Sequence, residues 1–100
     1  TSGQRNQSAP EIPTLNESGL PGYEVTSWYA MYAPSGTPLP IIQKLNTDIA
    51  KVLALPDVKA WFDTQAAQAG GGSPEALAAF QAAETIKWRT LIKAADIKAQ

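Results

Sequence analysis

The chain contains one segment with the character of a buried β-strand, Tyr23–Ala33, and a single strand cannot complete a sheet. The segment is rich in aromatic and β-branched residues, and its last six residues are apolar or aromatic at both parities. This pattern is typical of a strand that is covered on both faces. Because a buried strand must pair its amide and carbonyl groups with a neighbour, we predict that the missing strands come from another part of a longer chain or from another copy.

Three amphipathic helices are predicted after this segment. Six of the eight prolines lie in the first 40 residues, whereas 13 of the 17 alanines lie in the second half, so the chain changes from irregular to helical character along its length. Thr37 and Ser73 each stand directly before a proline, the order expected of an N-cap and a first helical position. The predicted helices begin at Thr37-Pro38, Leu55-Pro56 and Ser73-Pro74, and the first and third end near Ala54 and Ala94.

The residues before the strand are predicted to be irregular apart from one short helix. Residues 1–13 are polar and interrupted by prolines, which favours a loop. Thr14 and Glu17 have the spacing of a capping box, in which each side chain bonds the backbone amide of the other residue. Gly19 suits the position just after the end of that helix. Residues 65–70 are a candidate for a short second strand.

The composition excludes several kinds of chemistry. The chain has no His and no Cys, which excludes Cys/His zinc sites, thiol nucleophiles and a His general base. A formal net charge of −1 gives no basic patch for nucleic acid. No acidic residue has a visible catalytic partner, so we predict no catalytic residue, no metal site, no cofactor and no enzyme activity. No apolar run reaches the roughly 20 residues that span a bilayer, and the polar first residues predict that this chain carries no signal peptide.

The candidate ligand-binding residues lie within the predicted strand. Aromatic and hydroxyl groups that can face a cleft stand together there, at Ser27, Trp28 and Tyr29. Packing in a core is the simpler interpretation of Trp28, as it is for Trp61 and Trp88 on the apolar faces of helices. Arg5 can meet a carboxylate as a bidentate donor, although a solvated surface position is the simpler interpretation of this arginine.

Several strings of the sequence, taken in order, resemble one protein family. They are PEIPTLNESGLPGY at residues 10–23, SWYAMYAPSGTP at 27–38, KLN at 44–46 and GGSPE at 71–75. Together they resemble the substrate-binding proteins of the tripartite tricarboxylate transporters, also called Bug proteins. The resemblance spans essentially all 100 residues.

The resemblance implies an α/β fold and a longer parent protein. The chain would be the C-terminal fragment of a type II periplasmic-binding-protein-like fold of two lobes, helix-rich with one main strand, in a parent about three times as long. Residues 1–22 would be an irregular crossover segment with a short helix, and residues 23–100 would supply a strand and three helices of the first lobe. The resemblance also implies a periplasmic protein that captures a small carboxylate and delivers it to membrane permease subunits, with no cofactor and no nucleic acid.

Two further expectations follow from the unpaired strand and the apolar helix faces. We expect the isolated chain to self-associate through residues 23–33, because an unpaired strand edge is a template for another chain. The alternative function is a helical protein-interaction module without ligand binding, whose apolar stripes dock a partner. A small hydrolase domain is nearly excluded, because the chain lacks His, Cys and paired carboxylates.

Overall fold

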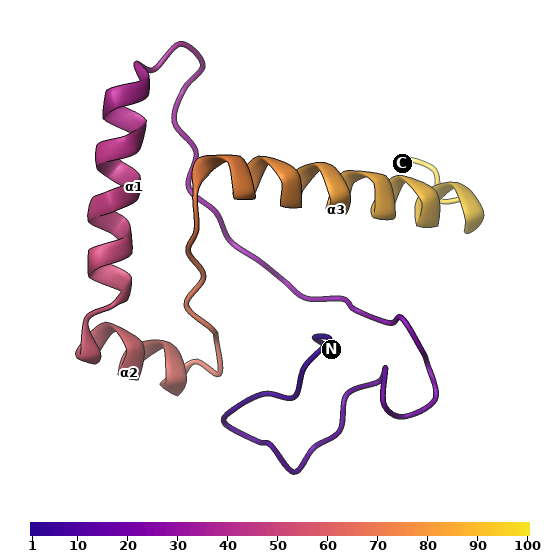
Figure 1. Ribbon diagram of the computed structural model, residues 1–100. Coiled ribbons are helices and arrows are strands. Elements are labelled where there is room, and N and C mark those ends of the chain that lie inside the picture. The colour runs from indigo at the N-terminus through magenta and orange to yellow at the C-terminus, as the bar shows by residue number, and fades with distance from the viewer. The chain divides into compact units, whose positions relative to one another are not determined.

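The computed structural model describes all residues from Thr1 to Gln100 and contains three α-helices and no β-strand. The helices are α1 (Leu39–Leu53), α2 (Pro56–Thr64) and α3 (Pro74–Ala94), and extended or looped segments join them (Figure 1). The chain divides into two compact units, one of residues 1–36 and 54–69 and the other of residues 37–53 and 70–100. The first unit therefore contains the N-terminal loop and α2, and the second contains α1 and α3.

The predicted strand Tyr23–Ala33 is not a strand in this structure. Residues 23–34 run without helix, turn or bend, but only Val25 exchanges backbone hydrogen bonds with another segment, through Thr1. A strand requires a ladder of such bonds with a neighbour, and no residue from 23 to 33 belongs to a strand. The expectation of one main strand is therefore wrong for this chain by itself, because the segment's pairing groups find no sheet within these 100 residues. Residues 65–70 do not form a strand either.

The helix starts follow the sequence closely. At α3, the Ser73 hydroxyl accepts a hydrogen bond from the Ala76 amide at 3.1 Å, and a proline occupies the first turn, as the cap-then-proline order predicts. At α2, Pro56 begins the helix after an extended Leu55 that offers no side-chain cap. The first helix, α1, begins at Leu39, slightly later than the predicted start at Thr37-Pro38.

Two helices end in the same way, with a residue in the left-handed conformation. After α2, Ala66 has φ +51°, and the amide of Ala67 donates to the Phe62 carbonyl at 3.0 Å. After α3, Asp96 has φ +49°, and the amide of Ile97 donates to the Ile92 carbonyl at 3.0 Å. This is the bonding of a Schellman motif, which satisfies the last carbonyls of a helix and is usually built with glycine. Ala66 therefore holds a backbone conformation that costs an alanine energy.

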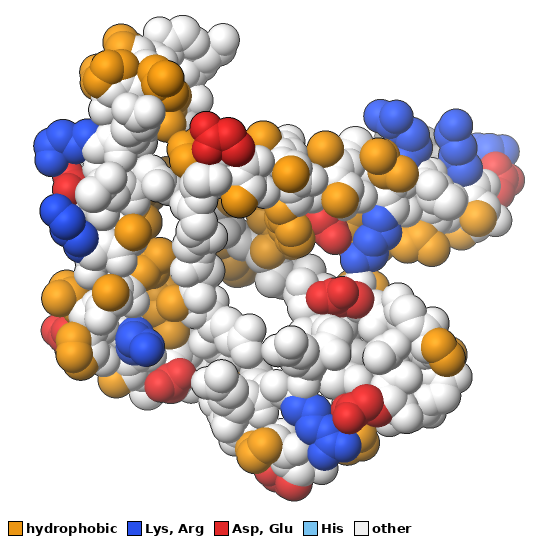
Figure 2. Space-filling view, viewed as in Figure 1, with side chains coloured by type: hydrophobic (Ala, Val, Ile, Leu, Met, Phe, Trp, Pro, Cys, Tyr) orange, Lys and Arg blue, Asp and Glu red, His pale blue; other side chains and the backbone are white.

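No hydrophobic side chain in the chain is buried. The one buried residue is Thr14, which is 4% exposed, whereas Trp61 is 59% and Trp88 38% exposed. The expectation that these two tryptophans lie in a core is therefore wrong for this chain, because nothing in it covers their helical faces completely. Figure 2 shows hydrophobic side chains, in orange, at the visible surface of all three helices.

Within the second unit, α1 contacts α3. The half-buried residues of α1 are Ile42, Asn46, Asp48, Ile49 and Leu53. The Asn46 side-chain amide donates to the Gly72 carbonyl at 2.8 Å, just before α3. Leu45 and Val52, which the pattern also places on the apolar face, are about half exposed, at 47% and 50%.

Candidate functional site

The three predicted ligand-binding residues lie on the extended segment of the first unit and do not line a pocket of this chain. Tyr29 is 99% exposed and Trp28 is 38% exposed, and Ser27 is also exposed. Successive side chains of an extended backbone point to opposite faces. Ser27 and Tyr29 therefore share one face of the segment, and Trp28 lies on the other. Ligand binding by these residues remains a prediction.

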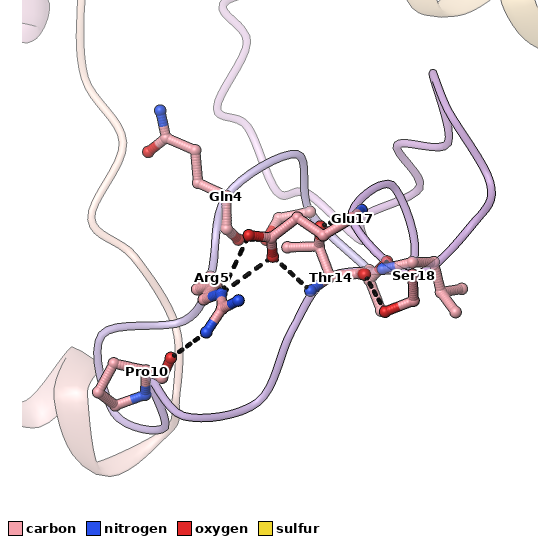
Figure 3. Close-up of polar contacts among 9 residues, drawn as sticks. Gln4, Arg5, Pro10, Thr14, Glu17 and Ser18 are labelled. Carbon is pink, nitrogen blue, oxygen red and sulfur yellow. Dashed lines mark hydrogen bonds and ion pairs between the residues drawn. The ribbon is translucent and has the colours of Figure 1, made fainter.

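The most developed polar cluster of the first unit joins Arg5 to Glu17 (Figure 3). Arg5 Nε lies 2.9 Å from Glu17 Oε2 and 3.2 Å from Oε1, and Arg5 Nη1 donates to the Pro10 carbonyl at 3.1 Å. The arginine thus meets a carboxylate, as its chemistry allowed, but the carboxylate belongs to the same chain. Because the side chains of Arg5 and Glu17 are 44% and 43% exposed, solvent screens the pair, and its geometry matters more than its Coulomb energy.

The capping box predicted at Thr14 and Glu17 is confirmed. Glu17 Oε2 accepts from the Thr14 amide at 2.9 Å, and Thr14 Oγ1 accepts from the Glu17 amide at 3.1 Å. The Ser18 hydroxyl adds a bond to the Thr14 carbonyl at 2.8 Å. These bonds support a hydrogen-bonded turn over residues 15–19, shorter than the helix that the capping box predicted. The buried Thr14 is the centre of this network.

The same network shifts the ionisation of its charged groups. The hydrogen bond from Arg5, followed by the bond from the Thr14 amide, lowers the pKa of the Glu17 carboxyl. Glu17 in turn raises the pKa of the Arg5 guanidinium. The ionised carboxylate is therefore the form that holds the loop. Sequence spacing identified Thr14 and Glu17, but no local pattern signalled that Arg5, twelve residues earlier, would join them.

Two tight turns carry the chain from this loop into the extended segment. Gly19 has φ +108°, and the Leu20 amide donates to the Leu15 carbonyl at 3.1 Å. Gly22 has φ +80°, and the Tyr23 amide donates to the Leu20 carbonyl at 3.0 Å. Both glycines adopt a conformation that other residues rarely accept. The turns therefore fix where residues 23–33 begin.

Two shallow pockets lie in the first unit. The first, of about 240 Å³, is lined by loop residues that include Arg5 and Thr14. The Arg5 charge already faces Glu17, so Arg5 is not an unpaired cation for an anionic ligand in this pocket. The second, of about 340 Å³, lies between the N-terminal loop and α2, and Lys59 and Asp63 stand one helical turn apart on its wall.

A second polar cluster lies on α3. Glu84 Oε2 accepts from the indole nitrogen of Trp88 at 2.8 Å, and Glu84 Oε1 lies 3.2 Å from Lys87 Nζ. The ammonium of Lys87 lies 5.6 Å from the centre of the Trp88 ring, within the range of a cation–π contact. The Glu84 side chain is only 15% exposed, whereas Trp88 is 38% exposed. Residues three and four positions later on the helix, Lys87 and Trp88, both bond this carboxylate.

The structure shows no grouping that points to metal chemistry or membrane insertion. No cluster of three or more His, Cys, Asp or Glu side chains occurs. None of the three helices has both the length and the apolar character that crossing a bilayer requires.

Comparison with known proteins identifies the class of protein. The family model described as the tripartite tricarboxylate transporter family receptor matches residues 1–97. This is a family of substrate-binding receptors and not a family of enzymes. The chain belongs to the tripartite tricarboxylate transporter receptor family, as the sequence strings predicted.

Individual relatives support the same assignment. The "UPF0065 protein in tcbD-tcbE intergenic region" of a Pseudomonas species is 42% identical over 93 residues, covering 92% of this chain and 28% of the relative. The protein from the clcB-clcD intergenic region of Pseudomonas knackmussii is 34% identical over 93 residues, covering 92% and 55%. Protein BugT of Bordetella pertussis is 31% identical over 97 residues, covering 97% and 30%. The chain thus spans between 28% and 55% of the length of these relatives. No solved structure gives a significant match.

Proposed function

We propose that this chain is the C-terminal part of a periplasmic solute-binding protein that captures a small carboxylate and delivers it to membrane permease subunits. The observation that carries this proposal is the receptor-family match over residues 1–97. The extended segment, which forms no strand, and the absence of a buried hydrophobic side chain support it, because both are expected of a piece that packs against the rest of a larger fold.

The proposed mechanism is closure of two lobes on the ligand. Residues 1–22 are the proposed crossover segment, and residues 23–100 belong to the first lobe. A carboxylate that contacts both lobes stabilises the closed state by its additional contacts there. The hydroxyl groups of Ser27 and Tyr29 and the indole N–H of Trp28 are donors suited to a carboxylate. The chain by itself contains only one wall of such a cleft.

Calorimetry tests this proposal. We expect no heat of binding when citrate or other di- and tricarboxylates are titrated into this chain. The longer natural protein is expected to bind at least one of them. Millimolar or tighter binding by the chain alone contradicts its role as one wall of a cleft. Failure of the longer protein to bind any carboxylate contradicts the ligand class.

A helical interaction module is the second candidate, favoured by the exposed apolar side chains of the helices, such as Trp61 and Phe80. Mass spectrometry of the protein in its source distinguishes the two. The solute-binding proposal expects a mature protein about three times the length of this chain, because 93 matched residues are 28% of one relative. A mature protein that begins at Thr1 favours the interaction module.

We also propose that the isolated chain self-associates through residues 23–33. Met31 and Tyr32 of this segment are 74% and 56% exposed, and an extended apolar edge pairs readily with another chain. Sedimentation analysis is expected to show dimers of intertwined chains. A monomer with a cooperative melting transition contradicts this expectation.

A further inference from the structure

One pair of hydrogen bonds defines a strand direction and a register for the extended segment. The amino group of Thr1 donates to the Val25 carbonyl at 3.0 Å, and the Val25 amide donates to the Thr1 carbonyl at 2.9 Å. Two residues that exchange both bonds form a hydrogen-bonded pair of an antiparallel ladder. A peptide nitrogen at Thr1 retains the hydrogen that this bond requires, so the pair is compatible with a chain that continues before Thr1.

The neighbouring backbone lets this ladder grow in one direction only. After Thr1 the chain bends at Gly3 and Gln4, and a turn over residues 20–23 precedes the segment on the other side. In the opposite direction, residues 26–34 continue without a bend. Their antiparallel partners, counted from the pair of Thr1 with Val25, are the residues that come before Thr1.

We propose that, in the longer protein, the residues directly before Thr1 form a strand antiparallel to residues 25–33. The register pairs the residue immediately before Thr1 with Thr26, the next with Ser27, and so on. This inference rests on the proposed function, since it requires the longer chain. This chain covers only 28% and 30% of two relatives. The longer protein therefore has the additional residues that such a strand needs.

The backbone groups and side chains of the segment suit this partner. In an antiparallel ladder the hydrogen-bonded pairs alternate, so the backbone groups of Ser27, Tyr29 and Met31 face the same edge as those of Val25. The amides of these three residues make no backbone hydrogen bond in this structure. The run of apolar residues at both parities from Trp28 to Ala33 is expected of a strand within a covered sheet.

The ladder also divides the candidate binding residues into two sets. Ser27 and Tyr29 share one face of the sheet and Trp28 belongs to the other. A carboxylate that is held by hydroxyl groups therefore contacts Ser27 and Tyr29 from one face of the segment. The substitutions Ser27→Ala and Tyr29→Phe are each expected to weaken carboxylate binding.

Disulfide trapping in the longer protein tests the register directly. The residue before Thr1 and Thr26 form a non-hydrogen-bonded pair, with Cα atoms about 4.5 Å apart, which suits a disulfide. Cysteines at these two positions are expected to crosslink within one molecule under mild oxidation. The matched control combines the same upstream cysteine with Glu24→Cys, whose diagonal separation of about 7–8 Å exceeds the range of a disulfide. Preferential crosslinking of the control, no crosslinking in either variant, or crosslinking only between molecules overturns the proposal.

Amide hydrogen exchange gives a second measurement without substitutions. The Val25 amide is expected to be protected both in this chain and in the longer protein. The amides of Ser27, Tyr29 and Met31 are expected to be protected only in the longer protein. Rapid exchange of these three amides in the longer protein overturns the proposed ladder.

Calorimetry of the longer protein separates this proposal from the proposed function. If the protein binds carboxylates but does not form the crosslink, the proposed function is retained and the ladder is wrong. If the protein forms the crosslink but binds no carboxylate, only the ladder is retained.

Discussion

The N-terminal loop and the extended segment that follows it use their hydrogen-bonding groups in opposite ways. In residues 1–22, the side chains of Arg5, Thr14 and Glu17 bond groups within the same loop. In residues 23–34, one residue, Val25, exchanges a pair of backbone bonds with Thr1. A turn satisfies itself from nearby residues, whereas a strand depends on a partner that can be far away in the chain. The loop therefore takes a defined form in this chain, and the segment remains without a sheet.

A proline in the extended segment tests this contrast most severely. Tyr29→Pro removes an amide that makes no bond in this chain, so the loop resonances of the chain are expected to remain unchanged in NMR spectra. In the longer protein the same change removes a ladder bond and is expected to cost about 3 kcal/mol in the free energy of unfolding, measured by urea denaturation. Tyr29→Phe is the control, since it keeps the amide. If Tyr29→Pro had the same effect on this chain and on the longer protein, that result would contradict the prediction that the amide of residue 29 makes a ladder bond only in the longer protein.

The buried threonine of the loop gives the next largest effect. Thr14→Ala removes the hydroxyl that accepts from the Glu17 amide and is expected to lower the free energy of unfolding of the longer protein by about 1–2 kcal/mol. Thr14→Ser keeps the hydroxyl and is expected to retain most of the stability. If alanine and serine are equally destabilising, the methyl group and not the capping bond holds this position.

Ala66 offers a stabilising change at the end of α2. Its φ of +51° lies in the left-handed region, where glycine has no steric penalty. Ala66→Gly is expected to raise the free energy of unfolding by about 1 kcal/mol, after the greater flexibility of glycine in the unfolded chain is subtracted. Ala67→Gly is the control, since Ala67 does not have positive φ, and it is expected to give no gain.

The pH dependence of the loop is the smallest effect. The folded loop lowers the pKa of Glu17 below its ordinary value of 4.5, so the unfolded chain binds the proton more readily. The stabilisation is therefore fully present above that ordinary value and is lost as the pH falls through the lower folded pKa. Glu17→Gln is expected to flatten this part of the stability profile in denaturation experiments at several acidic pH values. A wild-type profile that matches the Gln variant would show that the exposed ion pair contributes nothing.

Local chemistry explains which parts of the structure the sequence predicted. Ser73 and its following proline predicted the start of α3, and the predicted end near Ala94 is where the helix stops. The Thr14–Glu17 spacing predicted a reciprocal pair of bonds that the structure contains. Each of these features depends on residues within a few positions of one another. The family was also predicted correctly, because its sequence strings run the length of the chain.

Features that depend on contacts between distant residues could not be predicted from the sequence. Arg5 lies twelve residues before its carboxylate partner Glu17, and nothing in the local pattern signals that pairing. The exposure of Trp61 depends on what covers its helix, which an amphipathic pattern does not state.

The sequence by itself thus determined the starts of α2 and α3, the Ser73 cap, the capping box and the family, because each is encoded in short-range spacing or in matching strings. Only the tertiary structure decided that Tyr23–Ala33 lacks a ladder in this chain, that Thr1 meets Val25, and that the apolar helix faces stay exposed. The physical reason is that strand pairing and hydrophobic burial require a partner surface. A pattern of residues specifies the need for that surface but not where it lies.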